Sequence, residues 1–144
     1  MGVSSSVLIL LCCIGAFYSI AVLFGAHPIK QFWGNLAWGV LMSLLTCVPS
    51  LITVGSSRRH LSRVFIQGRF SRASEIGVYF GCIAALLGAW VGAFPILLDW
   101  RRPWQVWPIP CSIAAVALWT CYWIAYLTVQ TFWPHLLLIT RTPL

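Results

Sequence analysis

Charge is the property that this sequence most lacks. Only 8% of its 144 residues are charged, and two of these are acidic, whereas 60% of the residues are hydrophobic. A soluble domain carries about 25% charged residues, so this chain has too few charges to cover a surface that faces water. The composition excludes an ordinary soluble domain and predicts a protein that is solvated by lipid.

Long uncharged runs are what the sequence has instead. They cover residues 7–26, 32–54, 76–98 and 109–133. Each run exceeds the roughly 20 residues that a helix needs to cross a hydrocarbon core, and helices satisfy their own backbone groups in lipid. We predict an all-α membrane protein, a single domain over 1–144, with about four transmembrane helices. The first run is interpreted as a retained helix because MGVSSS before it has no basic residue.

The basic residues are divided unevenly between the two sides that four spans define. The side of the 55–75 loop holds six of them, and the other side holds three. The positive-inside rule therefore predicts that loop 55–75 lies in the cytoplasm and that loop 99–108 faces the lumen or the outside of the cell. The two groups are Arg58, Arg59, Arg63, Arg69, Arg72 and Arg141 on the first side, and Lys30, Arg101 and Arg102 on the second. This arrangement explains the net charge of +7 without a nucleic-acid partner.

Groups that could catalyse a reaction are few. The chain has no CxxC pair, no GxSxG motif and no GxxxxGK[ST] motif. Glu75, His60 and His135 fall on the cytoplasmic side, which leaves Asp99 and His27 on the other, too few ligands for a two-metal site. We therefore expect no catalytic residue, no metal and no cofactor.

Two alternatives stay open at this stage. A lumenal phospholipid headgroup transferase or hydrolase would need Asp99 and His27 to lie close together, and a Ser-His-Asp arrangement is compatible with the many serines. A lipid-handling membrane protein would need a polar cavity between its helices, whereas no ionisable residue lies well inside any span.

Small residues at helical spacing mark one face of the third span. Lipid gives helices no hydrophobic drive to associate, so close contact across small residues is a main source of helix packing. This face is predicted to pack on a helix, either of this chain or of a partner, and a stripe on the fourth span is its candidate neighbour. The face comprises Gly77, Gly81, Gly88 and Gly92, and the stripe Ala114, Ala117, Cys121 and Ala125.

The short connection between the third and fourth spans, DWRRPWQVWP, is unusually rich in tryptophan and proline. Prolines stiffen its backbone, and Asp99 can fix a turn by pairing with Arg102. Tryptophan suits the membrane interface, where its ring is apolar and its N–H stays in water. We predict a fixed surface for a partner or for lipid. It comprises Asp99, Trp100, Arg102, Pro103, Trp104, Gln105, Trp107 and Pro108.

The block GAFPILLDWRRPWQVWPIPC, residues 92–111, resembles the signature of the PIG-F family. Weaker matches follow the family order at 22–26, 43–49 and 63–65. The chain departs from the family pattern at Arg101, where members have an acidic residue, and at Leu97, where they have proline. Members have additional helices upstream, so we expect this chain to lack them.

The resemblance implies a non-catalytic subunit of GPI-anchor biosynthesis in the endoplasmic reticulum membrane. Family members bind and stabilise the large ethanolamine-phosphate transferases, which add phosphoethanolamine to mannose residues of the GPI precursor. The implied partners of this chain are therefore such a transferase and membrane lipids, with no nucleic acid and no cofactor.

Overall fold

A computed structural model describes residues 3–98 and 102–132 of the protein. In these ranges the chain is helical and forms no strand, and four helices are long and apolar enough to cross a membrane. The predicted all-α fold is confirmed. The long helices are α1 (Val3–Leu23), α2 (Phe32–Thr53), α4 (Ala73–Val91) and α6 (Ile109–Phe132), and the short ones are α3 (Arg58–Phe65), α5 (Phe94–Leu97) and the 3-10 helix η1 (Pro103–Gln105).

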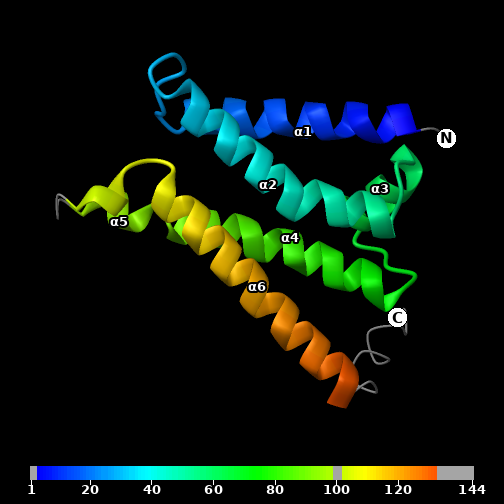
Figure 1. The fold of residues 1–144 in the computed structure, drawn as a ribbon. Helices are drawn as coiled ribbons and strands as arrows, with labels where there is room; N and C mark the ends of the chain where they lie inside the picture. Colours follow the sequence, from blue (N-terminus) through cyan, green and yellow to red (C-terminus); the bar gives the residue numbers. More distant parts are fainter. Residues whose placement is uncertain (1–2, 99–101, 133–144) are drawn as a thin grey trace.

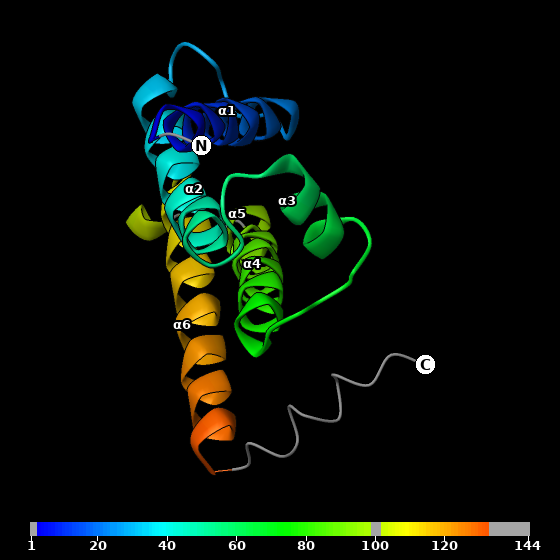
Figure 2. The same ribbon diagram turned by 90° about the vertical axis from the view of Figure 1, so that its right-hand side faces the viewer.

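The central helix of the bundle is α2. It contacts α1 as well as α4 and α6, and Figures 1 and 2 show α1 lying across it while α4 and α6 run together. In the most apolar stretch of each span, 39% of the residues are buried in α2 and 33% in Ala73–Leu97, which contains α4, against 6% in α1 and 11% in α6. The two outer helices therefore offer most of their surface to lipid or to another protein.

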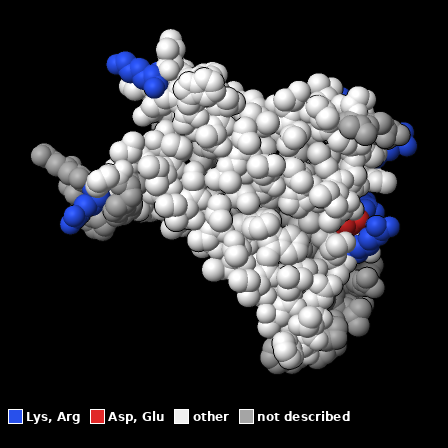
Figure 3. Space-filling view, viewed as in Figure 1, with Lys and Arg blue, Asp and Glu red and all other residues white. Residues whose placement is uncertain are grey.

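Charged groups lie at the two ends of the bundle. The connection between α1 and α2 lies at one end with α5 and η1, which we name the α5 end, and α3 lies at the opposite end, the α3 end (Figure 1). Lys and Arg atoms gather at both ends in Figure 3, and the surface between them on this face is uncharged. This distribution is the one expected of a protein that crosses a hydrocarbon layer.

Two backbone features determine where the spanning helices end. The amides of Gly25 and Ala26 donate to the carbonyls of Val22 and Ala21, and Gly25 has a φ of 101°, which is the glycine-terminated Schellman ending of a helix. At the other span, α4 ends at Val91 and α5 begins at Phe94. In a continuous helix the ring of Pro95 would clash with the carbonyl of Val91, four residues back, and Pro95 has no N–H to donate to it. The third span is therefore broken there.

The interior is built mainly from small side chains. One cluster of buried residues joins α1, α2, α4 and α6, with Trp38 and Met42 as its only large members. Serine and threonine hydroxyls within α2 donate to carbonyls four residues back, as Ser43 does to Gly39 at 2.8 Å, so these polar groups are satisfied inside the span. Pro49 lies inside α2, which continues to Thr53, although proline commonly kinks or ends a helix.

The basic connection between α2 and α4 contains helix α3, which was not predicted from the sequence. Within α3, Val64 is fully buried and Phe65 packs beside Tyr79 with ring centroids 5.9 Å apart. The apolar residues 64–66 therefore do not face one way. Val64 is buried inside the protein, whereas Ile66 is 81% exposed.

An ion pair fixes α3 to the start of α4. The guanidinium of Arg63 lies 2.8 Å from a carboxylate oxygen of Glu75, whose side chain is 5% exposed. The other carboxylate oxygen accepts the amide N–H of Ser71 at 2.7 Å, and the hydroxyl of Ser71 accepts a hydrogen bond from Arg63. Hydrogen bonding on both oxygens explains how a carboxylate is buried at this end of the span.

Candidate functional site

The candidate site is the connection between α4 and α6, where eight residues were predicted to form a partner or lipid surface. The structure describes six of them, Arg102, Pro103, Trp104, Gln105, Trp107 and Pro108, and for Trp104 the backbone only. Asp99 and Trp100 lie outside the described residues, as does Arg101, so the expected pairing of Asp99 with Arg102 stays a prediction.

Gln105 holds this connection together. Its side-chain amide donates to the carbonyls of Pro95 and Leu98, each at 2.6 Å, and its Oε1 accepts the backbone N–H of Arg102 at 2.9 Å. The first two bonds tie η1 to α5 and to the residue that follows it, and the third caps the start of η1. The half-buried side chain of Gln105 therefore holds the loop in shape.

Trp107 anchors the same loop to the centre of the bundle. Its indole Nε1 donates to Oδ1 of Asn35 at 2.7 Å, and its ring packs on Trp38 with centroids 5.3 Å apart. Asn35 is fully buried, and its Nδ2 donates to the carbonyl of His27 at 3.2 Å. The expectation that Trp107 keeps its N–H in water is wrong, because Asn35 provides a closer partner inside the protein.

The polar role of Asn35 was missed in the sequence. Asn35 and Gln130 look alike in the sequence, since each is an amide near the end of an apolar run. Gln130 is indeed exposed, but Asn35 joins two connections of the α5 end. The available signal was its position four residues into an apolar run, where a polar side chain requires a partner.

The loop therefore has an inner and an outer side. On the inner side, Pro108 fits against Gly34, where a Cβ atom would lie 3.3 Å from the proline ring. On the outer side, Arg102, Pro103 and Val106 are exposed. The result is a short surface whose backbone is fixed from behind, and we name these three residues the outer loop surface.

The glycines of α4 lie against α6, within the same chain. A Cβ atom at Gly88 would lie 2.5 Å from the carbonyl oxygen of Ala114, and one at Gly92 would lie 2.5 Å from that of Pro110. No side chain fits at that distance. The two backbones consequently touch at the α5 end of these helices.

Further along the pair, aromatic side chains of α6 occupy the space over the glycines. A Cβ atom at Gly77 would lie 2.8 Å from the ring of Tyr126, and one at Gly81 would lie 3.3 Å from Nε1 of Trp123. The hydroxyl of Tyr126 donates to the carbonyl of Ala73 at 2.8 Å. The contact thus changes from backbone on backbone to ring on backbone along α4.

The stripe expected on α6 is largely wrong. Ala114 is at the contact, but Ala117, Cys121 and Ala125 are exposed. The helix instead turns a different set inward, namely Pro110, Cys111, Ala115 and Tyr126. Small size alone did not identify the packing face, because rings can also pack on glycine.

Side chains that could ligate a metal or take part in catalysis are scattered over the described part of the chain. Within residues 3–98 and 102–132, no three His, Cys, Asp or Glu side chains gather where they could hold a metal ion. Glu75 is bound to Arg63 at the α3 end, and His27 is exposed at the α5 end. The six cysteines are free thiols.

These features define a class: a multi-pass helical membrane protein with a braced, tryptophan-bearing loop at one end. Within that class, the chain belongs to the GPI biosynthesis protein family Pig-F, whose family model matches residues 1–133. The resemblance drawn from residues 92–111 is thereby confirmed.

Named relatives agree with this membership. The chain is 36% identical over 118 residues to the human GPI ethanolamine phosphate transferase, stabilizing subunit, and the match covers 82% of this chain and 52% of the relative. It is 38% identical over 114 residues to the mouse protein of the same name, covering 79% and 50%. A third relative is glycosylphosphatidylinositol anchor biosynthesis protein 11 of Yarrowia lipolytica, 38% identical over 93 residues, with coverage of 64% and 40%.

The chain spans about half the length of the mammalian relatives that it matches. No solved structure matches it.

Proposed function

We propose that this chain is an accessory, non-catalytic subunit that binds and stabilises a GPI ethanolamine phosphate transferase. The observation that carries the proposal is the match over 82% of the chain to a relative named as the stabilizing subunit of that transferase. The subunit would support the addition of phosphoethanolamine to mannose of the GPI-anchor precursor. Its partners would be the transferase and the surrounding membrane lipids, and not nucleic acid.

The proposed location is the endoplasmic reticulum membrane, with loop 55–75 in the cytoplasm and loop 99–108 in the lumen. The excess of arginine at the α3 end supports this orientation. The outer loop surface would then face the lumen.

The outer loop surface is the proposed contact with the transferase. Arg102 is exposed, and its guanidinium forms no hydrogen bond or ion pair with any residue that the structure describes. Gln105 and Trp107 fix the backbone behind it, so little conformational entropy would be lost when a partner binds. Arginine and tryptophan are often found at the energetic centre of interfaces, and Trp104 lies between Pro103 and Val106 in the sequence.

Affinity capture of a tagged transferase from membranes in mild detergent tests the proposal. Arg102→Glu should lower the amount of this chain recovered with the transferase about fivefold or more. Arg59→Glu is the matched control, because it makes the same charge change at an exposed arginine of the α3 end, and it should leave recovery unchanged. Trp104→Ala should also lower recovery without removing the chain from the membrane.

Two results would overturn this proposal. One is a wild-type chain that never recovers with a transferase. The other is full recovery of both Arg102→Glu and Trp104→Ala, with the membrane-bound amount of each variant measured as a reference.

A further inference from the structure

A groove lies at the α5 end, between α1 and the segment that joins α4 to α5. Its volume is about 530 Å³, within the range of sites that hold small ligands. The walls are mainly apolar and include Phe17, Ile20, Leu86, Trp90, Ile96 and Trp107. Because it opens between helices that cross a membrane, hydrocarbon and not water is the medium outside most of it.

Depth sets a first limit on what the groove can hold. Along α1 its wall extends from Phe17 to Phe24, and seven helical residues rise about 10 Å. Half of a hydrocarbon core is about 15 Å thick. The groove thus starts at the end of the helix and reaches most of the way through one leaflet, as an acyl chain does.

The most polar side chains of the groove lining lie at one end, in the connection between α1 and α2. His27 and Gln31 line it there, and Lys30 precedes Gln31 in the same exposed connection. Oε1 of Gln31 accepts a hydrogen bond from the backbone N–H of His27 at 3.2 Å. The side-chain NH2 group of Gln31 is therefore left to donate to a ligand. Neither this donor nor the side chains of His27 and Lys30 bond to another described residue.

We propose that this groove binds a glycerophospholipid of the leaflet at the α5 end. One acyl chain lies along the apolar wall between α1 and α4, and the phosphate is bound by Lys30, His27 and Gln31. Apolar depth and unpaired donors at the mouth match the two parts of such a lipid. The inference is independent of whether the chain binds a transferase.

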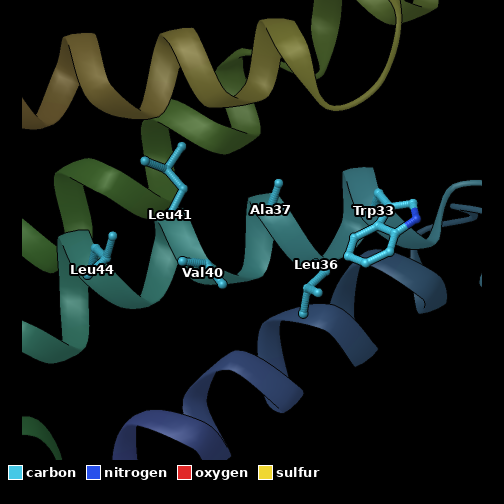
Figure 4. Close-up of a pocket in the computed structure, with 6 residues that line it drawn as sticks. All are labelled: Trp33, Leu36, Ala37, Val40, Leu41 and Leu44. Carbon is cyan, nitrogen blue, oxygen red and sulfur yellow. The ribbon is translucent and has the colours of Figure 1, made fainter.

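A second hollow shows why shape alone is not sufficient. It lies along α2 and has a volume of about 430 Å³ (Figure 4), and all its lining residues come from that one helix. They are Trp33, Leu36, Ala37, Val40, Leu41 and Leu44. No cluster of polar groups marks an end of this hollow, so it carries no proposal.

Native mass spectrometry of the full chain tests the phospholipid. The protein is equilibrated in detergent with equal amounts of dioleoyl phosphatidylcholine and dioleoylglycerol, which share acyl chains and differ in the phosphate-bearing headgroup. The wild type should retain one phosphatidylcholine molecule per chain in preference to dioleoylglycerol. Lys30→Gln should reduce that preference about fivefold or more, because one charge-assisted hydrogen bond to the phosphate is lost.

A second variant fills the groove. Ala93 lines it between α4 and α5, and Ala93→Phe should abolish retention of both lipids. Ala117→Phe is the control, since it adds the same ring to an exposed position of α6 and should retain phosphatidylcholine as the wild type does. Lys30→Gln keeps the exposed loop and the groove intact, so the test survives even if Ala93→Phe does not fold.

Three outcomes would overturn the inference. The first is a wild type that retains no phospholipid or retains both lipids equally. The second is retention by Ala93→Phe equal to that of Ala117→Phe. The third is loss of the phospholipid whenever the transferase is bound, which would assign the groove to a helix of that protein.

Discussion

The indole nitrogen of Trp107 lies 2.7 Å from the side-chain oxygen of Asn35, although 72 residues separate them in the sequence. This bond connects the loop before α6 with the first turn of α2. Through the second bond of Asn35, to the carbonyl of His27, it also reaches the connection between α1 and α2. One buried amide therefore fixes the relative positions of two loops.

Replacing Asn35 with leucine should destabilise the protein. The N–H of Trp107 would lose its partner, and the carbonyl of His27 would keep only the backbone N–H of Gln31, at a cost of about 1–3 kcal/mol. Thermal unfolding in detergent measures the effect. Gln130→Leu is the matched control because Gln130 is exposed on α6, and equal unfolding temperatures for the two variants would contradict the role given to Asn35.

Substituting alanine for Gly88 should separate α4 from α6. The added methyl group would lie 2.5 Å from the carbonyl oxygen of Ala114, so the helices must move apart, at a cost of about 1–3 kcal/mol. Gly15→Ala in α1 has nothing within 4 Å of the added atom and should be neutral or slightly stabilising. The same unfolding assay decides, and a stable Gly88→Ala variant would refute the close contact.

Glu75→Gln should weaken the attachment of α3. The substitution keeps the shape of the side chain but leaves Arg63 without its counterion, and water at the partly exposed guanidinium limits the cost to about 1–2 kcal/mol. A double-mutant cycle with Arg63→Gln isolates the pair. Coupling predicts that Glu75→Gln costs less in the Arg63→Gln background, whereas additive effects would show that the pair contributes nothing.

The proposed orientation predicts which positions react from each side of the membrane. Single cysteines replacing Gln67 and Val106, both exposed, are treated with an impermeant maleimide in sealed microsomes. Gln67→Cys should react at once, because the positive-inside rule places its loop on the cytoplasmic face. Val106→Cys should react only after the membrane is permeabilised, and the reverse pattern would invert the assignment.

Apolar length was sufficient to predict the four spans but not their interruptions. The predicted run 32–54 begins with α2 and ends within one residue of it, and the run 109–133 begins at the first residue of α6. The third run was predicted as one helix to residue 98, yet α4 ends at Val91, because Pro95 disrupts the backbone without changing hydrophobicity. Hydrophobic length therefore predicts whether a segment crosses, and backbone chemistry predicts where it breaks.

The sequence was sufficient to predict where the candidate site lies, but not which hydrogen bonds hold its loop in place. The density of Trp and Pro drew attention to the loop, but the bonds of Gln105 and Trp107 depend on segments that the sequence gives no means of placing. Helix α3 was missed because eight residues show too little of the helical period to stand out from a basic loop.

The bond between Asn35 and Trp107 also has a consequence for biogenesis. During synthesis, α2 emerges from the ribosome before residue 107 does. During that interval, the side-chain oxygen of Asn35 cannot yet accept the hydrogen bond from Trp107. The bond can form only after the connection between α4 and α6 has emerged. Its formation therefore follows the insertion of α2 and marks the arrival of that connection beside it.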